Sequence, residues 1–272
     1  MSLDRNALAR IIAERLRSHR DSLRAQWLNS TPIRYFFQEN LLPEDLVRSL
    51  AEAFPSPEKL TLRSSLREHK RVGVDIRRYD PSIGECLFAF QHPEVIQAIS
   101  EITQLKGLEA DPTLYASGIS VMGKGDFLNP HLDNSHDGDG LRYRVLNLLF
   151  YVSPGWNLEN GGTLELWNSS VTKAQVILSN FNRLIVMGTD NTNWHSVSKV
   201  LVDQPRYCVS NYYFSKNSPL GEKHYTQVTT FTGRPEEPLN RFLLQADALL
   251  RNLAGRLLPN YRKKSKHRIL PS

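Results

Sequence analysis

The chain has 272 residues, of which 40% are hydrophobic and 23% are charged, and its formal net charge is +6. This composition is ordinary for a globular protein, and the length allows one large domain or one domain with extensions. No apolar run approaches the roughly 18–20 residues needed to cross a bilayer, so we expect no transmembrane segment.

Two further features of composition concern the cellular compartment. No apolar stretch follows the first residues, so they do not resemble a signal peptide. Two cysteines, Cys86 and Cys208, are too few for a disulfide framework and fit a reducing compartment. We therefore expect a cytoplasmic protein, and the mild positive charge is compatible with a peripheral position at an anionic surface.

Helical periodicity dominates the first part of the chain. Apolar residues at three- and four-residue steps predict helices over residues 4–29, 43–53 and 93–105, with a short strand at 33–37. We group residues 1–110 as a helical support region.

Residues 58–92 lack a clear pattern of either kind. The segment 64–78 is rich in arginine and lysine and has few candidates for a core position. A solvated loop is the favoured interpretation, and a basic lip over an active site is the alternative.

Strand patterns replace helical ones from residue 114 onward. The expected strands cover residues 114–122, 143–152, 162–167, 175–178, 183–187, 196–201 and 206–214. Glycine, asparagine and proline clusters separate them. Short strands at regular spacing, with helices gathered before them, predict a mainly β fold with flanking α-helices: a sandwich or jelly roll backed by the N-terminal helices. Residues 111–216 would form the catalytic core.

The last region, residues 217–272, begins with a loop and continues as an amphipathic helix over 239–258. We expect this helix to pack its apolar face on its own domain. The tail, 260–272, has six basic or histidine side chains and no acid. We expect it to be solvated and to bring the protein to an anionic surface, either a membrane or a ribonucleoprotein.

Three residues have the types and spacing of a metal site. Residues two apart on a strand point to the same face, so His131 and Asp133 can direct an imidazole and a carboxylate at one point. His195, from a later strand, is the best candidate for a third ligand. Two histidines and one carboxylate on one face of an octahedral ion are the ligand set of non-haem Fe(II) oxygenases.

Such an oxygenase usually needs a two-electron reductant in its site. If that reductant is 2-oxoglutarate, its keto-acid end chelates the metal and its far carboxylate needs a buried cation. Arg206, one strand and a turn after His195, suits this role because a guanidinium makes two charge-assisted hydrogen bonds to a carboxylate. Lys199 is the next candidate.

The order and spacing of six motifs resemble the prolyl 4-hydroxylase-like branch of the 2-oxoglutarate/Fe(II)-dependent oxygenase superfamily. The resemblance spans roughly residues 118–215. Its motifs are NPHLD (129–133), LNLLFYVSPGW (146–156), NGGTLELW (160–167), NRLIV (182–186), WHSV (194–197) and PRYCVSNYYF (205–214). We therefore expect a double-stranded β-helix core.

The resemblance also implies roles for individual residues. His131, Asp133 and His195 would be the iron ligands and the catalytic centre. Arg206 would anchor 2-oxoglutarate, Tyr151 would help to bind its far carboxylate, and Asn147 would share the face of Tyr151 by strand alternation.

Two positions depart from the pattern of many relatives. Cys208 stands where a hydroxyl residue is common, and Tyr151 or Ser210 would have to compensate. Met122 stands where some relatives have a second tyrosine for the cosubstrate. The alternation that places Tyr151 in the cavity places Arg142 and Arg144 on the opposite face.

The resemblance implies a hydroxylase that uses Fe(II), 2-oxoglutarate and O₂ on an unactivated C–H bond, with ascorbate as an additional cofactor to be tested. The substrate stays open between a prolyl residue of a protein or peptide and a small molecule: an amino acid, a carrier-bound intermediate, or a sugar or lipid head group. A non-catalytic jelly roll, acting as a sensor or scaffold, is the other class, and the intact ligand set argues against it.

Overall fold

The structure is a computed structural model, and it describes residues 4–73 and 75–257. The helices are α1 (Arg5–Ser18), α2 (Arg20–Asn29), α3 (Glu44–Glu52), α4 (Pro81–Ala89), α5 (Pro93–Thr103) and α6 (Pro238–Leu257). The strands are β1 (Tyr35–Gln38), β2 (Thr61–Ser64), β3 (Glu68–Gly73), β4 (Gly118–Met122), β5 (Phe127–Leu132), β6 (Tyr143–Tyr151), β7 (Leu164–Trp167), β8 (Ala174–Ile177), β9 (Arg183–Gly188), β10 (His195–Val197), β11 (Arg206–Ser215) and β12 (Thr230–Phe231). The predicted class, mainly β with flanking helices, is confirmed.

The first predicted helix is two helices, α1 and α2, which meet at His19. Asp4 caps α1 by accepting a hydrogen bond from the backbone N–H of Ala7. At its other end the side chains of Ser18 and His19 both contact the carbonyl oxygen of Arg15. These local side-chain bonds compete with the helical ladder and favour a break at this point.

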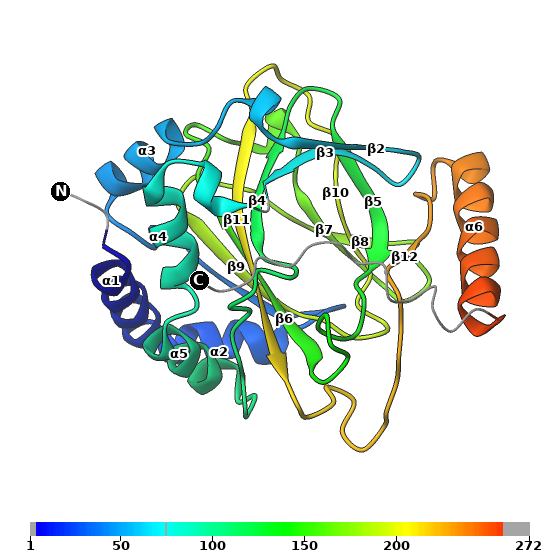
Figure 1. The fold of residues 1–272 in the computed structure, drawn as a ribbon, viewed down its shortest axis with the longest axis horizontal. Helices are drawn as coiled ribbons and strands as arrows, with labels where there is room; N and C mark the ends of the chain where they lie inside the picture. The colour runs from blue at the N-terminus through cyan, green and yellow to red at the C-terminus, as the bar shows by residue number, and fades with distance from the viewer. Residues whose placement is uncertain (1–3, 74, 258–272) are drawn as a thin grey trace.

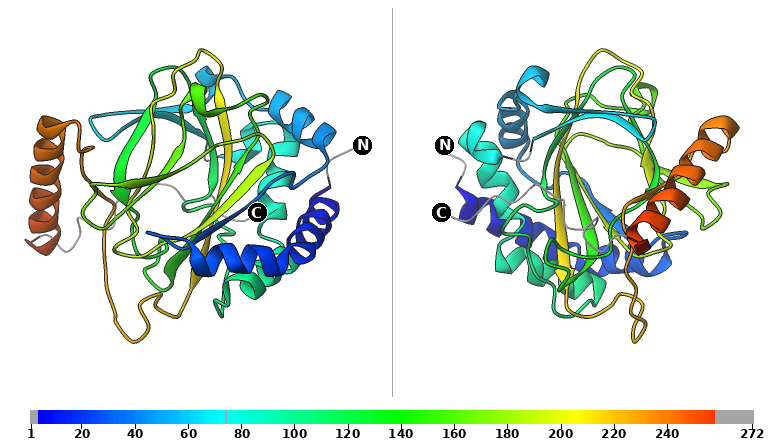
Figure 2. Two further views of the ribbon diagram at one scale, coloured as in Figure 1. Left: turned by 180° about the vertical axis from the view of Figure 1, so that it is seen from behind. Right: turned by 45° about the vertical axis from the view of Figure 1, so that its right-hand side comes forward.

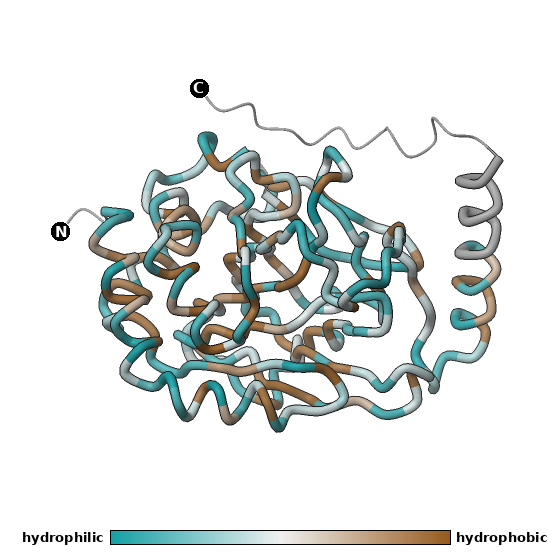
Figure 3. The backbone as a smooth tube through the Cα atoms, turned by 90° about the horizontal axis from the view of Figure 1, so that it is seen from below, coloured by the Kyte–Doolittle hydropathy of each residue, from teal (hydrophilic) through white to brown (hydrophobic). Residues whose placement is uncertain are grey.

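The N-terminal helices form a layer on one side of the sheet, and α6 lies on the opposite side (Figures 1 and 2). Along α1, buried residues such as Leu8, Ile12 and Leu16 recur at four-residue steps, and they belong to the same core cluster as Val145 and Leu148 of β6. Hydrophobic and hydrophilic residues accordingly alternate along α1 in Figure 3. The helical layer thus supports the strands from behind.

The strands pair antiparallel in one continuous path with the order β1-β9-β6-β11-β4-β3-β5-β10-β7-β8, and β12 adds to β5 while β2 adds to β3. Within this path, β3 pairs with both β4 and β5. It therefore joins the half of the sheet that contains β6 and β11 to the half that contains β5 and β10.

The basic segment between α3 and α4 includes β3, which forms a hairpin with β2, so the favoured interpretation of residues 64–78 as a solvated loop is wrong. Strand β3 pairs with β4 and β5. The hairpin contributes four residues to the lining of the main cavity: Arg63, Arg67, Glu68 and Lys70. The alternative interpretation, a basic lip over the site, agrees with this position. Helix α4, which the sequence patterns did not predict, also lies within the unassigned range 58–92.

Helix α6 begins and ends close to the predicted positions, but its packing differs from the expectation. Leu244 is buried, whereas Leu239 and Phe242 are 71% and 68% exposed. Over residues 238–247, whose side chains the structure describes, the apolar face therefore packs on the domain only in part. Within the described residues, no helix has the length and apolar character needed to cross a membrane. The basic tail, 260–272, lies outside the described residues, and its attraction to an anionic surface stays a prediction.

Candidate metal centre

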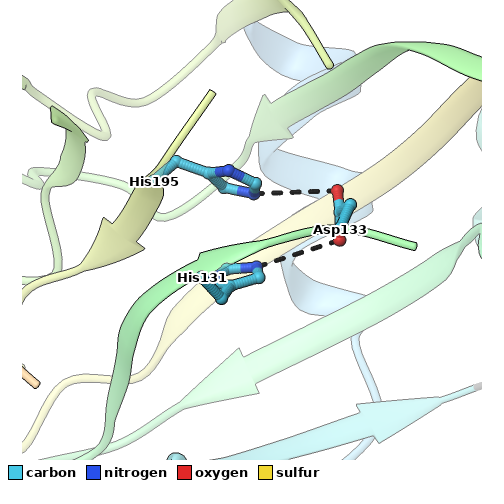
Figure 4. A group of neighbouring side chains, drawn as sticks. All are labelled: His131, Asp133 and His195. Atoms are coloured by element: carbon cyan, nitrogen blue, oxygen red, sulfur yellow. Dashed lines mark ion pairs between the residues drawn. The ribbon is translucent and has the colours of Figure 1, made fainter. Parts of the chain in front are cut away.

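Three predicted ligands come together at adjacent strands. His131 is in β5, Asp133 follows the end of β5, and His195 begins β10. The two strands pair antiparallel with His195 opposite His131. Both imidazole rings point toward the carboxylate of Asp133 (Figure 4). Strand pairing thus brings the distant histidine to the local His-x-Asp motif.

The backbone holds both imidazole rings in one orientation. The Nδ1 atom of His131 lies 3.0 Å from the carbonyl oxygen of Asn129, and that of His195 lies 3.0 Å from the carbonyl oxygen of Asn193. A carbonyl oxygen only accepts, so each Nδ1 must be the donor. Each Nε2 therefore keeps a free lone pair, which is the state in which a histidine binds a metal.

The distances between the three side chains fit a cation placed among them. Nε2 of His131 is 3.9 Å from Oδ1 of Asp133, and Nε2 of His195 is 3.7 Å from Oδ2. These separations are too long for hydrogen bonds. The ligand atoms nevertheless lie within 4.8 Å of one another, and Oδ2 is buried without a hydrogen-bond partner among the described residues. A divalent ion would satisfy all three groups.

Electrostatics keep the two neighbouring ligands in their metal-binding protonation states. Burial, reinforced by His195, lowers the pKa of His131 to about 3. Burial alone would raise the pKa of Asp133, but the positive charge of Arg144 and the two imidazoles outweigh it and lower that pKa to about 2. At neutral pH the site is therefore a neutral imidazole beside a carboxylate anion.

Arg144 belongs to the site, although the alternation of side chains along the strand predicted that it would face away from the cavity. Its Nη1 atom lies 3.0 Å from Oδ1 of Asp133, and its guanidinium lies 4.3 Å from the ring centre of Tyr212. The side chain is 6% exposed and its Nε has no hydrogen-bond partner among the described residues. Arg144 therefore supplies the cation that offsets the buried carboxylate.

The prediction that Arg142 and Arg144 both face away from the cavity is wrong for Arg144. It assumed a regular strand between Arg144 and Tyr151. The pairing of β6 with β11 instead skips Val145, which is a local irregularity of the bulge type. An extra residue reverses the alternation, so Arg144 joins Asn147 in the cavity lining.

The triad opens into a cavity of about 580 Å³ that also contains Arg206. Arg206 is 3% exposed, and no acidic side chain pairs with it among the described residues. Its Nε lies 3.2 Å from Oγ of Ser179, and its guanidinium lies 4.6 Å from the ring centre of Tyr151. A buried cation without a counter-ion is suited to an anionic ligand. Lys199, the other anchor candidate, is exposed.

The remaining predicted residues lie around the same cavity. Asn147 lines it, and Nδ2 of Asn147 is 3.4 Å from the hydroxyl of Tyr212. Tyr151 is fully buried against Arg206, and its hydroxyl has no hydrogen-bond partner among the described residues. Cys208 and Ser210 also line the cavity.

Ser179 is a hydroxyl residue near Arg206 that sequence reasoning did not find. It follows β8 and is 1% exposed, and its hydroxyl donates to the carbonyl oxygen of Gly162. Its oxygen can still accept a hydrogen bond from Arg206. A hydroxyl is therefore available beside the guanidinium although Cys208 offers none.

Comparison with known proteins identifies this arrangement. The profile of the family described as the 2OG-Fe(II) oxygenase superfamily matches residues 117–214. This chain carries a domain of the 2OG-Fe(II) oxygenase superfamily. Fe(II) and 2-oxoglutarate (2OG), which give the superfamily its name, are the cofactor and cosubstrate of such domains, and the predicted family is confirmed.

Individual relatives agree with the oxygenase assignment. Prolyl 3-hydroxylase OGFOD1 of Mus musculus is 26% identical over 119 residues, which are 42% of this chain and 21% of that protein. The oxygenase chain thus aligns with about a fifth of its relative's length. A Pseudomonas putida prolyl-4-hydroxylase has a TM-score of 0.51 at 20% identity and covers 71% of this chain and 98% of its own.

A second solved structure supports the fold. An oxidoreductase of the 2OG-Fe(II) oxygenase family from Burkholderia pseudomallei has a TM-score of 0.52 at 14% identity, with 73% of this chain and 91% of that chain covered. At these identities the likeness shows the fold alone. It confirms the expected double-stranded β-helix core.

Proposed function

We propose that this protein is a hydroxylase that depends on Fe(II), 2-oxoglutarate and O₂, with His131, Asp133 and His195 as the metal ligands. One observation carries the proposal: the triad shares a cavity with Arg206, a buried guanidinium without an acidic partner. A metal site and a separate carboxylate site in one cavity match the two ends of 2-oxoglutarate. When bound, the iron would activate O₂, which is the oxidant, and 2-oxoglutarate would supply two electrons as it becomes succinate and CO₂; one oxygen atom would enter succinate and the other would convert the C–H bond to C–OH.

The protein's own groups bind and orient. Backbone carbonyls fix the two imidazole rings, and Arg144 keeps Asp133 ionised beside them. Arg206 would bind the far carboxylate of 2-oxoglutarate through charge-assisted hydrogen bonds, and the face of the Tyr151 ring would keep the guanidinium in place. Burial of these groups limits the access of water to the site.

For the substrate we propose a prolyl residue of a protein or peptide. The support is the kind of relative found: one curated relative and one solved structure of the same fold are prolyl hydroxylases by name. A cavity of about 580 Å³ has room for a cosubstrate and one extended side chain.

The test of the reaction is succinate formation from 2-oxoglutarate under air, with Fe(II) and a panel of prolyl peptides. We expect His131→Ala, Asp133→Ala and His195→Ala each to abolish Fe(II)-dependent turnover. His19→Ala is the matched control, because His19 is exposed and lies outside the cavity. Full turnover by any triad variant would remove that residue from the ligand set.

Hydroxylated product identifies the substrate. Mass spectrometry of the peptides should show an added oxygen on proline that depends on 2-oxoglutarate. Turnover of 2-oxoglutarate that no prolyl peptide stimulates, together with stimulation by a small molecule, would keep the oxygenase and replace the prolyl substrate.

A further inference from the structure

A lysine of strand β3 lies in line with Arg206 across the sheet. Arg206 of β11 pairs with Met122 of β4. Strand β3 pairs with the other edge of β4 and places Arg71 opposite Val121. One step further along this register, Lys70 lies opposite Met122. Lys70, Met122 and Arg206 thus form one row across three neighbouring strands (Figure 1).

The side chains of this row point into the cavity that holds the triad. Paired residues of neighbouring strands lie on the same face of a sheet, and all three members of the row line the cavity. Arg71, the next residue of β3, contacts Asp126 instead. Two strand spacings separate the backbones of Lys70 and Arg206 by roughly 10 Å. Both side chains are long enough to reach one ligand group placed over Met122.

The guanidinium of Arg206 extends toward the middle of the row. Its Nη1 lies 3.6 Å from Sδ of Met122, the residue between the two cations. A thioether is a weak acceptor, so this contact leaves Nη1 available for a stronger one. The Nε atom faces Ser179 at 3.2 Å. A carboxylate bound at Nη1 would therefore lie on the side of the guanidinium that is nearer to Lys70.

The thiol of Cys208 experiences both positive charges. Cys208 comes two residues after Arg206 on the same strand and lines the same cavity. Burial raises the pKa of this thiol to about 11, and the charges of Arg206 and then Lys70 oppose that rise. The two cations therefore act on the same part of the cavity wall, which agrees with the strand register.

Lys70 keeps donors for a ligand. Its side chain is 17% exposed, and its Nζ lies 3.0 Å from Oε2 of Glu68. An ammonium group has three N–H donors, and this contact uses one of them. Arg63, which pairs with Lys70 from β2, also faces Glu68, with its Nη1 3.9 Å from Oε1. The carboxylate of Glu68 is therefore shared, and Lys70 is only partly neutralised.

We propose that Lys70 is a second cation of the far-carboxylate site, and that it binds, together with Arg206, the carboxylate of 2-oxoglutarate that lies away from the metal. The ammonium group would approach this carboxylate from β3 and the guanidinium from β11. This inference rests on the proposed function.

The experiment measures ligand binding without turnover. Fe(II)-loaded protein is titrated without oxygen, by calorimetry, with 2-oxoglutarate and with 2-oxobutanoate, which has the keto-acid end but no far carboxylate. We expect Lys70→Met to raise the Kd of 2-oxoglutarate roughly tenfold and to leave that of 2-oxobutanoate unchanged. Arg206→Met should show the same selectivity with a larger loss, because Arg206 has no competing acidic partner among the described residues.

Three further variants distinguish a binding role from a structural one. Lys70→Arg keeps the charge and should retain most of the affinity for 2-oxoglutarate. Glu68→Gln removes the competing carboxylate and should tighten the binding of 2-oxoglutarate alone, a change opposite in sign to that of Lys70→Met. Arg71→Met, on the same strand but the other face, is the matched control and should bind both ligands as the unaltered protein does.

Contrary results are separable. If Lys70→Met binds 2-oxoglutarate as tightly as the unaltered protein, or loses affinity for both ligands equally, this assignment is overturned while the proposed function stands. If the unaltered Fe(II)-loaded protein binds neither ligand, the proposed function falls and the inference with it. Should Lys70→Met fail to fold, Lys70→Gln and Glu68→Gln decide the question.

Discussion

Arg144 determines how well Asp133 can bind a cation, because it is the strongest positive influence on that carboxylate. Its ion pair with Oδ1 orients the carboxylate and keeps it ionised. Arg144→Met should therefore weaken Fe(II) or Mn(II) binding by roughly 10–100-fold, the usual effect of losing a group that supports a metal ligand. Calorimetric titration of the metal-free protein measures this loss.

Arg142 provides the matched control for Arg144. It lies two residues earlier, but it pairs with Asp137 and Glu109 and does not line the cavity. Arg142→Met should keep the metal affinity, and Arg144→Lys should restore part of it. Equal affinities for Arg144→Met and the unaltered protein would mean that the ion pair does not support the site.

His131 should make the metal-free protein less stable in acid. Burial holds its pKa at about 3 in the folded protein, against 6.5 for an ordinary histidine. Between these values the unfolded chain binds a proton that the folded protein does not, so the free energy of unfolding falls as the pH drops. Asp133, with its pKa lowered from 3.8 to about 2, acts in the same direction at lower pH.

Urea unfolding of the metal-free protein near neutral pH and at about pH 4.5 tests this expectation. The loss of stability between the two conditions should be larger in the unaltered protein than in His131→Asn, which has no group that titrates there. The same loss in both proteins would mean that other groups govern the acid sensitivity.

The alternation of side chains along a strand correctly predicts which residues face the cavity when the strand is regular and carries a recognisable motif. His131, Asp133, His195 and Arg206 share one cavity as the sequence predicted. Arg144 could not be placed, because a bulge reverses the alternation and leaves no mark in the local sequence. Side chains brought together by loops, as Ser179 is, are missed for a similar reason: their contact depends on the whole fold.

At the scale of elements, the β2–β3 hairpin shows why some strands escape prediction. All four residues of β2 are exposed, and β3 is half-buried along most of its length. Neither strand has the alternation of apolar and polar residues that identifies one. β3 is stabilised by pairing with β4 and β5, which are more than forty residues away in the chain, and β2 pairs with β3. Helices α3, α5 and α6, whose periodicity is local, were predicted more closely, whereas α4 was not predicted.

The Gly161–Gly162 turn sets the position of Arg206. Gly162 has a φ of +61°, and a Cβ atom there would lie 2.7 Å from Cδ of Arg206. Gly162→Ala should therefore displace the guanidinium and weaken 2-oxoglutarate binding several-fold, besides straining the turn. Gly123→Ala is the control, because nothing lies within 4 Å of its added Cβ. Anaerobic titration measures both, and unchanged binding by Gly162→Ala would show that the turn does not position Arg206.

The segment before α6 is tied to β7 by a buried ion pair and to β10 by a hydrogen bond. Nη1 of Arg234 lies 2.6 Å from Oε2 of Glu165, which also accepts a hydrogen bond from Ser196, and Nη2 of Arg234 donates to the carbonyl oxygen of Val197. Arg234→Met leaves the Glu165 charge unpaired and should lower the free energy of unfolding by about 3–5 kcal/mol.

Denaturant unfolding measures the effect of Arg234→Met. The double variant Arg234→Met/Glu165→Gln removes both charges and should recover part of the loss. If Arg234→Met were as stable as the unaltered protein, the Arg234–Glu165 ion pair would contribute no more to stability than an ion pair exposed to solvent.

At the scale of the whole molecule, the cavity is built from segments far apart in sequence. Residues 117–214 contribute the triad and Arg206, the hairpin contributes Lys70, and β12 contributes Phe231, whose ring stacks on His131 at 5.1 Å. The helical layer and the strands share one core cluster. Long-range pairing of this kind is the part of the fold that local sequence patterns cannot show.

The central place of β3 in the sheet limits how this protein can be dissected. A shortened gene that begins at residue 111 would encode the triad and Arg206 but would leave β4 and β5 without the strand that lies between them. Two open edges in the middle of a sheet expose unpaired N–H and C=O groups and invite self-association. Such a fragment should aggregate when it is produced alone. Coexpression with residues 1–110 as a separate polypeptide should restore a folded, metal-binding complex, as size-exclusion chromatography and metal titration would show.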